Sequence, residues 1–368
     1  MIKRPTTALH FGNLSSALAE FGALYDAAPA YPAKSVELLV RSGLHATFAP
    51  PECGGERFSD AVAENIALFD CLRFVGRADL SLGRIFEGHV NALKLLGWYG
   101  TEIQKKRLRD DLSLGRLFGC WATEPAPGVT LEADPFGWRL TGAKRFATGA
   151  GGLDFAIVTA RPIEGPRRLA IVPADVAERA DNGDWRVRGM RATMSGAYDL
   201  EGLRLNDDDL LGAPGDYDRE PRFTAGAWRF CAVHLGGTEA LLAETRIAMS
   251  EAARSDPLQR ATFGGAVVAA RTAYLWTREA ALRAAADDID AIPFVQMTRG
   301  VVERAALDVM EAAARIAGTR SAFDGQRIDK ITRDLSLYLR QAGPDHARDQ
   351  AAIAWLNHDV WGSGDDLW

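Results

Sequence analysis

The chain has 368 residues, of which 47% are hydrophobic and 25% are charged. These values are close to the averages of soluble globular proteins, so they argue against disordered, collagen-like and disulfide-scaffold classes. With 43 Lys and Arg against 49 Asp and Glu, the formal net charge is -6. No overall basic field therefore favours a nucleic acid or an anionic membrane as a partner.

The cysteines and histidines indicate neither a disulfide framework nor a metal site. The four cysteines are far apart and form no CxxC motif, which predicts reduced thiols in a cytoplasmic protein. The histidines form no HxxxH pair, so no metal is expected. The sequence begins without an apolar segment ahead of a cleavage site and has no run of about 18 uncharged apolar residues. We therefore expect neither export nor membrane insertion.

Residues 1–120 predict an N-terminal helical domain. Leu18, Phe21 and Leu24 are spaced by three, and the same amphipathic spacing recurs several times before residue 120. Prolines and glycines at 50–55 interrupt the pattern, so the domain contains several helices rather than one.

The sequence pattern changes twice after residue 120. Residues 121–220 contain short β-rich runs among Gly, Pro, Asp and Asn, which predicts a middle β-domain. Residues 221–368 are rich in Ala and again helical, which predicts an antiparallel C-terminal bundle. The expected fold is therefore mostly α with a central β-domain that is packed between the two helical parts.

Six segments resemble motifs of the acyl-CoA dehydrogenase family and occur in the family's order. They are LLVRSGLHATFAPPECGGERFS at 38–59, LKLLGWYGTEIQKKRL at 93–108, WATEP at 121–125, LTGAKRFAT at 140–148, GMR at 189–191 and RATFG at 260–264. The order of helices, β-barrel-like domain and four-helix bundle is also that of the family. The resemblance implies an FAD-dependent oxidoreductase of this fold.

The resemblance also implies that two β-domain segments contact the isoalloxazine ring of FAD. A flavin needs an apolar surface for its ring faces and hydrogen-bonding groups near N1, O2 and N5, where charge collects on reduction. Strand backbones and hydroxyl groups meet this need. The positions that match the family's motifs are Trp121, Ala122 and Thr123 in the first segment and Phe146, Ala147 and Thr148 in the second.

Further matching positions lie in the C-terminal helices. A planar guanidinium can bind the FAD pyrophosphate with paired hydrogen bonds, which suits Arg260 with Thr262 beside it, and Phe263 can flank the adenine. Gly318 falls in the family's glycine-containing segment. In the family these positions reach the cofactor of a neighbouring subunit, which implies a homodimer or a homotetramer. Residues 126–130 lack the family's phosphate-holding serine, so a different flavin stays open.

The residue that acts as catalytic base in most of the family is missing. Removal of the α-proton of an acyl thioester requires a carboxylate opposite flavin N5, and the family places a Glu in a turn after an Arg-Asp pair. Arg333 and Asp334 match the pair, and counting without gaps places Ala342 at the Glu position. A minority of the family has the base on the first bundle helix, but the matching stretch at 225–230 contains no acid.

Three residues are candidates for proton transfer in place of that base. His346 follows the altered turn, and His89 and Glu87 lie on a predicted N-terminal helix. Histidine titrates near neutral pH, and flavin monooxygenases related to this fold favour histidines near the flavin. For each candidate the alternative is a hydrogen-bonded structural role.

These observations leave three hypotheses for the function. The first is an FAD-dependent oxidoreductase that acts on an acyl-CoA or a related carbonyl compound, with an atypical base and an electron-transfer partner. The second is a flavin monooxygenase that receives reduced flavin from a partner reductase and uses oxygen. The third is a non-catalytic flavin-binding or assembly protein, which the alanine at position 342 motivates.

Overall fold

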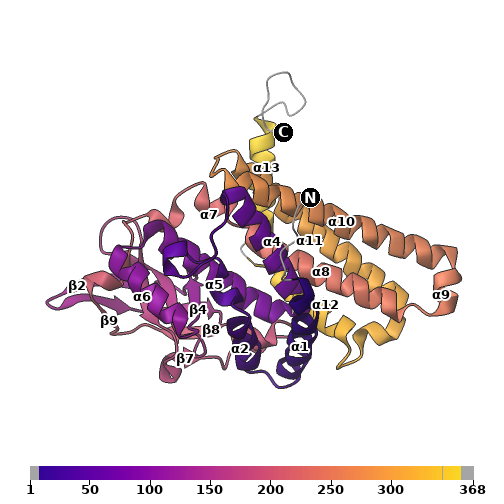
Figure 1. The fold of residues 1–368 in the computed structure, drawn as a ribbon, viewed down its shortest axis with the longest axis horizontal. Helices are drawn as coiled ribbons and strands as arrows, with labels where there is room; N and C mark the ends of the chain where they lie inside the picture. The colour runs from indigo at the N-terminus through magenta and orange to yellow at the C-terminus, as the bar shows by residue number, and fades with distance from the viewer. Residues whose placement is uncertain (1–7, 342, 358–368) are drawn as a thin grey trace.

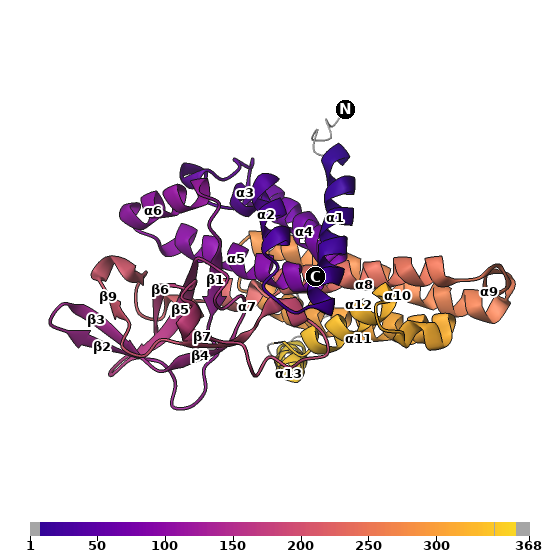
Figure 2. The same cartoon turned by 90° about the horizontal axis from the view of Figure 1, so that it is seen from below.

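The three parts of the chain are arranged along one long axis. In the computed structural model, which describes residues 8–341 and 343–357, the β-domain lies at one end and the long bundle helices extend to the other (Figure 1). The N-terminal helices lie along one side of both parts, with α5 against the β-domain and α4 against the bundle (Figure 2). The expected fold class, mostly α with a central β-domain, is confirmed.

The N-terminal helices converge on α5. Their bounds are α1 Ala8–Ala27, α2 Ala33–Arg41, α3 Leu44–Thr47, α4 Ala61–Ala78, α5 Leu80–Tyr99 and α6 Glu102–Ser113, with a 3-10 turn at Pro51–Cys53. α5 is apolar on most of its faces because it packs against β1 on one side and against α4 and α8 on the other. Asp79 caps α5 by accepting a hydrogen bond from Leu82 N at 2.8 Å.

The β-domain is built from two sheets. The strands are β1 Phe118–Trp121, β2 Thr130–Asp134, β3 Gly137–Thr141, β4 Ala143–Ala147, β5 Phe155–Pro162, β6 Arg168–Pro173, β7 Ala180–Asp181, β8 Gly196–Asp199, β9 Arg204–Leu205 and β10 Leu210–Leu211. The larger sheet has the order β10-β6-β5-β2-β3-β9 with β1 paired to β5, and the smaller has the order β4-β8-β7. Trp121, Leu140 and Tyr198 belong to the apolar core of this domain.

The C-terminal part forms the bundle. Its helices are α7 Arg222–Ala225, α8 Trp228–Ala248, α9 Glu251–Ser255, α10 Pro257–Ala285, α11 Ala291–Ala317, α12 Arg327–Tyr338 and α13 Pro344–Leu356. α8, α10 and α11 pack against one another, and α4 from the N-terminal part packs against α8 and α10. The bundle therefore includes a helix that the sequence assigns to the N-terminal layer.

Glycines allow α4 and α8 to approach closely. A Cβ atom added at Gly236 would lie 2.2 Å from Arg73 O, and one added at Gly76 would lie 2.5 Å from Val233 O. Both distances are shorter than any van der Waals contact, so the two helices can take this separation only without a side chain at these positions.

A buried ionic cluster ties α12 to the other parts. Lys330 Nζ lies 2.6 Å from the Asp79 carboxylate and 2.7 Å from the Asp334 carboxylate. Asp334 also accepts a hydrogen bond from Met190 N at 2.5 Å, and Arg333 beside it pairs with aspartates of α1 and α12. The Arg-Asp pair noted in the sequence therefore joins the bundle to α1, α5 and the β-domain. We call Asp79, Lys330 and Asp334 the α12 triad.

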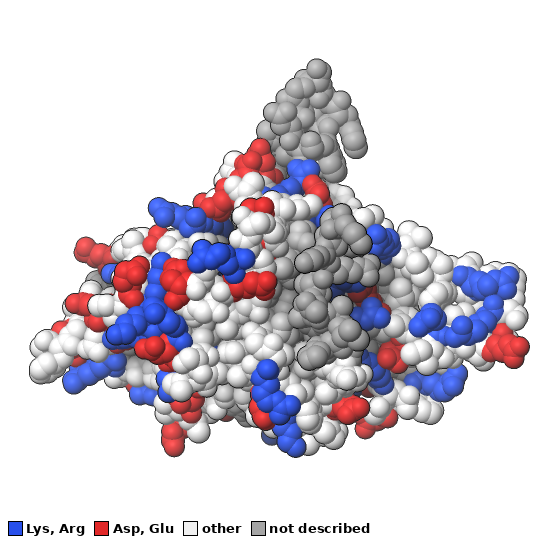
Figure 3. Space-filling model, viewed as in Figure 1, with Lys and Arg blue, Asp and Glu red and all other residues white. Residues whose placement is uncertain are grey.

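Charged side chains of both signs are interspersed on the face shown in Figure 3. All four cysteines are free thiols. Over the described ranges, no helix is both long and apolar enough to cross a lipid bilayer.

Candidate active site

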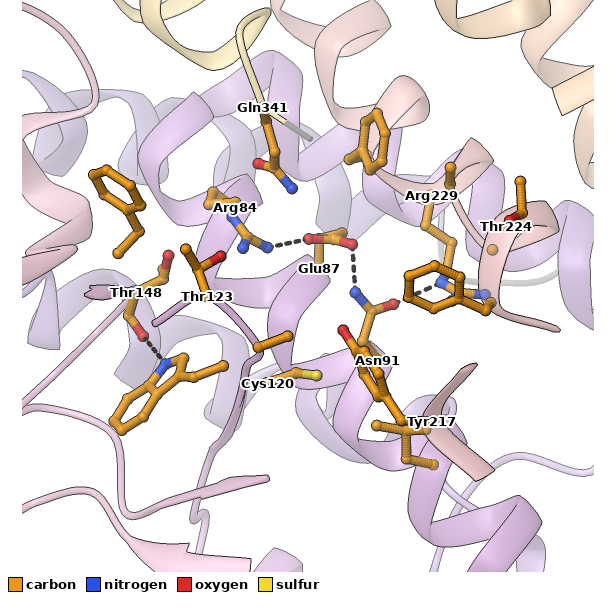
Figure 4. Close-up of a pocket in the computed structure, with 18 of the residues that line it drawn as sticks. Arg84, Glu87, Asn91, Cys120, Thr123, Thr148, Tyr217, Thr224, Arg229 and Gln341 are labelled. Atoms are coloured by element: carbon orange, nitrogen blue, oxygen red, sulfur yellow. Dashed lines mark hydrogen bonds and ion pairs between the residues drawn. The ribbon is translucent and has the colours of Figure 1, made fainter. Parts of the chain in front are cut away.

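A cavity of about 880 Å³ lies where α5, the β-domain and the bundle meet. Its walls come from α5, from β1 and the residues after it, from the end of β4, from residues 190–195 and from α7, α8, α11, α12 and the start of α13. Ligand sites in proteins commonly have volumes of roughly 300–1,000 Å³. The lining combines aromatic rings, hydroxyl groups and arginines (Figure 4), so this cavity is the candidate active site.

Most of the β-domain residues expected to contact a flavin line this cavity. They are Trp121, Ala122, Thr123, Phe146 and Thr148. The buried Trp121 indole donates a hydrogen bond from Nε1 to Thr148 O at 3.0 Å, which joins the two segments. The side chain of Ala147 lies instead in the core of the β-domain, because successive residues of a strand point to opposite faces.

A row of three hydroxyl groups continues this wall, and sequence analysis did not identify two of them. Thr193 Oγ1 donates to Met190 O at 2.8 Å, Ser195 Oγ donates to Thr193 Oγ1 at 2.8 Å, and Thr148 Oγ1 lies 3.0 Å from Ser195 Oγ. Because the Ser195 hydroxyl already donates its proton to Thr193, Thr148 must be the donor to Ser195, and the lone pairs of Thr148 Oγ1 remain available. Thr148 can therefore accept a hydrogen bond from an N–H group in the cavity. We call Thr148, Ser195 and Thr193 the hydroxyl row.

Two aromatic rings extend the wall beyond the hydroxyl row. Phe146 has a φ of 55° at an irregularity in β4, and its side chain is 51% exposed. Its ring centroid lies 6.4 Å from that of Trp185, which also lines the cavity. A positive φ is uncommon for a bulky residue and is found at functional sites. The two rings meet edge to face, with an angle of 69° between their planes, and form an aromatic part of the cavity lining.

On the helical side, α5 presents polar groups along one face. Arg84, Glu87 and Asn91 follow one another at spacings of three and four residues, which places them on the same side of the helix. Glu87 accepts hydrogen bonds from Arg84 Nη1 and, at 2.5 Å, from Asn91 Nδ2. Asn91 Oδ1 accepts from Arg229 Nε of α8 at 2.6 Å. We call these four residues the α5–α8 polar row (Figure 4).

The three candidates for proton transfer lie in different surroundings. Glu87 lines the cavity and is only 2% exposed, and His346 lines it from the exposed first turn of α13. His89 is fully buried between α5 and β1: its Nδ1 accepts from Phe118 N at 3.0 Å, and its Nε2 lies 2.7 Å from His45 O. Both ring nitrogens of His89 thus bind backbone groups, and His89 is not among the cavity residues.

Two carboxylates line the cavity in the described ranges, and both are engaged by other groups. Glu87 is held by Arg84 and Asn91. Asp216 accepts a hydrogen bond from Ala213 N at 2.7 Å and lies 3.6 Å from Arg219. Ala342, at the family's Glu position, lies outside the described residues.

The C-terminal residues expected to bind the cofactor lie outside this cavity. Arg260, Thr262 and Phe263 are in the first turns of α10, next to α9 at the end of the bundle away from the β-domain (Figure 2). Arg260 donates to Ser255 O at 2.6 Å, and Gly318 follows the end of α11. Within one chain these residues do not meet the β-domain wall.

Comparison with known proteins gives relatives of two activities. The dibenzothiophene monooxygenase of Mycolicibacterium goodii is 26% identical over 342 residues, covering 81% of each chain. The mitochondrial short-chain specific acyl-CoA dehydrogenase of Sus scrofa is 28% identical over 200 residues, covering 50% of this chain and 47% of its own length. No family model matches the sequence.

Solved structures share the fold over nearly the whole chain. FMN-bound TdsC from Paenibacillus sp. A11-2, a dibenzothiophene monooxygenase, superposes with a TM-score of 0.84 at 21% identity, covering 95% of this chain and 98% of TdsC. A glutaryl-coenzyme A dehydrogenase superposes with a TM-score of 0.81 at 19% identity, covering 97% of each chain.

The expected resemblance is therefore confirmed: this chain is a divergent relative of the acyl-CoA dehydrogenases and of the flavin monooxygenases that share their fold. Both groups are flavin enzymes, and the cavity fits such a group, because it combines an aromatic surface with a hydroxyl acceptor at Thr148. In sequence, the monooxygenase aligns over more of the chain than the short-chain dehydrogenase does.

Proposed function

We propose that this protein is a monooxygenase that uses reduced flavin and oxygen to transfer one oxygen atom to an organic substrate. The observation that carries the proposal is the state of the cavity carboxylates. Glu87 is bound by Arg84 and Asn91, and alanine stands where the dehydrogenases have their base. Oxygen transfer needs no such base, and the sequence relatives that align over 81% of the chain are monooxygenases. This places the second hypothesis ahead of the first.

A reduced flavin supplies two electrons and two protons, so that one oxygen atom of O2 leaves as water while the other enters the substrate. The chain's own residues position the reactants. Trp121, Phe146 and Trp185 give an aromatic lining that excludes water, and the Thr148 hydroxyl is an acceptor for a ring N–H group. His346 lines the cavity from the exposed first turn of α13. A partner reductase would deliver the reduced flavin.

The flavin that we propose is FMN in place of the FAD expected from the sequence. TdsC is a relative in fold that binds FMN. Residues 126–130 lack the serine that helps the family to hold phosphate. The single phosphate of FMN needs fewer hydrogen-bond donors from the protein than the pyrophosphate of FAD does.

We propose that two copies of the chain associate through α10. Leu258, Ala261, Gly265, Val268, Thr272 and Leu275 form one exposed, uncharged stripe at spacings of three and four residues. Leu258 is 77%, Val268 66% and Leu275 55% exposed. Such a stripe suits helix packing between copies, and it would bring Arg260, Thr262 and Phe263 to the cofactor of the neighbour.

The test of the activity uses purified protein, FMN, a flavin reductase with NADH, and indole or dibenzothiophene as probe substrates. Benzenesulfinate is a third, anionic probe, which one oxygen atom converts to benzenesulfonate. In the presence of ¹⁸O2 we expect at least one of the probes to give a product that is heavier by one ¹⁸O atom, detected by mass spectrometry, and no product without oxygen. Anaerobic bleaching of the bound flavin by butyryl-CoA would instead establish the dehydrogenase. A protein that binds no flavin in either redox state would support the non-catalytic hypothesis.

A further inference from the structure

The cavity carries more positive than negative groups. The arginines that line it are Arg84, Arg167, Arg222, Arg229, Arg299 and Arg340, and the lining carboxylates are Glu87 and Asp216. Charged groups in a partly enclosed cavity interact strongly with a ligand because little water screens them. The distribution of these charges therefore bears on the kind of substrate that the cavity accepts.

Several of the arginines are neutralised by carboxylates in direct contact. Arg167 Nε donates to Asp218 at 2.7 Å, and Arg222 Nε donates to Asp287 at 2.9 Å. Arg84 pairs with Glu87. These contacts hold the three guanidinium groups on the protein.

Arg229 is different. Its Nε donates to Asn91 Oδ1 at 2.6 Å, and Asn91 is a neutral amide. Across the described parts of the chain, no carboxylate is in ion-pair contact with Arg229, because Glu87, the closest acid in the row, is engaged by Arg84. Burial lowers the pKa of Arg229, and the more distant Glu87 carboxylate acts in the opposite direction. A largely buried cation whose contact partner is a neutral amide and not a carboxylate is costly, and a bound anion would reduce that cost.

The position of Arg229 suits a substrate rather than the flavin. Thr123 and Thr148, which belong to the β-domain side of the cavity, lie opposite Arg229, and Thr224 and Tyr217 lie near Arg229 (Figure 4). The Arg84–Glu87 pair lies between the two sides. A molecule bound to Arg229 by one end can therefore direct its other end toward the β-domain side of the cavity.

We propose that the substrate carries a carboxylate or a sulfur oxyanion, and that Arg229, oriented by Asn91, binds this group. A guanidinium can donate two parallel hydrogen bonds to such a planar or tetrahedral oxyanion. The proposal rests on the proposed function, because it takes the β-domain side of the cavity as the place of the flavin. It also distinguishes this chain from relatives named for dibenzothiophene, which is uncharged.

The test is calorimetric titration of the protein saturated with oxidised FMN, without a reductant, so that binding is measured independently of turnover. Benzoate and benzenesulfinate are the acid probes, and benzamide is the uncharged control of the same shape. We expect the acids to bind at least about tenfold more tightly than benzamide at low salt and to lose affinity as salt is added. The stronger of the two acids identifies the preferred oxyanion.

Variants assign the preference to Arg229. Arg229→Met should reduce the ratio of acid to amide affinity to about one, and Arg229→Lys should retain part of it, because Lys keeps the charge but not the paired donors. Arg246→Met is the matched control, since Arg246 is an exposed residue of the same helix and is not among the cavity residues. It should leave the ratio unchanged.

Equal affinities of wild type for acids and amide, or no detectable acid binding, would overturn the proposal. The proposal would also be overturned if Arg229→Met or Arg229→Lys had the same ratio of acid to amide affinity as wild type. The titration measures binding only, and the ¹⁸O2 assay measures oxygen transfer. If the acids bind selectively but the ¹⁸O2 assay gives no labelled product, the proposed function is contradicted and the assignment of Arg229 is not.

Discussion

Glu87 is the residue on which the α5–α8 polar row depends. Among the four residues of the row it is the one acid, and its side chain is only 3% exposed. Glu87→Gln keeps the shape of the side chain but leaves both Arg84 and Arg229 without a nearby negative charge. We expect the free energy of unfolding to fall by about 2–4 kcal/mol in urea titrations.

The same variant should bind benzoate about threefold or more tightly than wild type, because the row gains one positive charge. Glu311→Gln, which alters an exposed ion pair with Arg315 on α11, is the control and should change neither quantity. A Glu87→Gln protein as stable as wild type would show that the row is not held by this carboxylate.

His89 predicts a dependence of stability on pH. Burial lowers the pKa of His89 to about 4 in the folded protein, whereas an unfolded histidine has a pKa of about 6.5. Above pH 6.5 both states are neutral, and the full stability is present. As the pH falls toward 4, the unfolded chain binds a proton that folded His89 does not accept, so stability decreases by about 3 kcal/mol from this residue.

In His89→Gln the amide can still bind His45 O and Phe118 N, but it does not titrate. The difference in unfolding free energy between pH 7 and pH 4 should therefore be smaller in the variant than in wild type by about 3 kcal/mol. Identical pH profiles of the two proteins would contradict the buried neutral state of His89.

At the scale of elements, the contact of α4 with α8 depends on glycine. Gly236→Ala would place a methyl group 2.2 Å from Arg73 O, and we expect it to lower the free energy of unfolding by about 3 kcal/mol or more. Gly264→Ala on α10 meets no atom within 4 Å and should raise stability by about 0.5–1 kcal/mol, because alanine favours a helix interior. Thermal unfolding of the two variants measures both effects.

The elements also show what the sequence could and could not predict. Helix and strand periodicity predicted the order of elements, and local motifs predicted that Trp121 and Thr148 lie at the site. Arg229, Thr193 and Ser195 were missed, since their place at the cavity depends on how α8 and residues 190–195 pack against α5. For Arg84 and Glu87 the sequence did contain a signal: they are charged residues spaced by three within an otherwise apolar helix, which predicts that they lie on one side of it. His89 lies two residues beyond Glu87 and so points about 200° away.

At the scale of the whole molecule, the exposed stripe on α10 predicts an assembly. Val268→Glu would place a charge in the middle of the stripe, and we expect it to shift the protein to single chains in light scattering. Its affinity for FMN should fall about tenfold or more if Arg260 of a second copy contributes to the phosphate site. Ile163→Glu, at an 84% exposed position after β5, is the control. Assembly of Val268→Glu equal to that of wild type would argue against the α10 interface.

The α12 triad has a consequence for how ligands reach the cavity. One carboxylate of Asp79 both caps α5 and binds Lys330, and Asp334 fastens the backbone of Met190 at the cavity wall. The α12 triad therefore connects α12, α5 and the β-domain at one point. The entrance for substrate is therefore expected on the other side of the cavity, where partly exposed ion pairs join α13 to α11 (Arg348 with Glu303) and α7 to the residues after α10 (Arg222 with Asp287). Motion there would admit a substrate without disturbing the β-domain wall of the cavity.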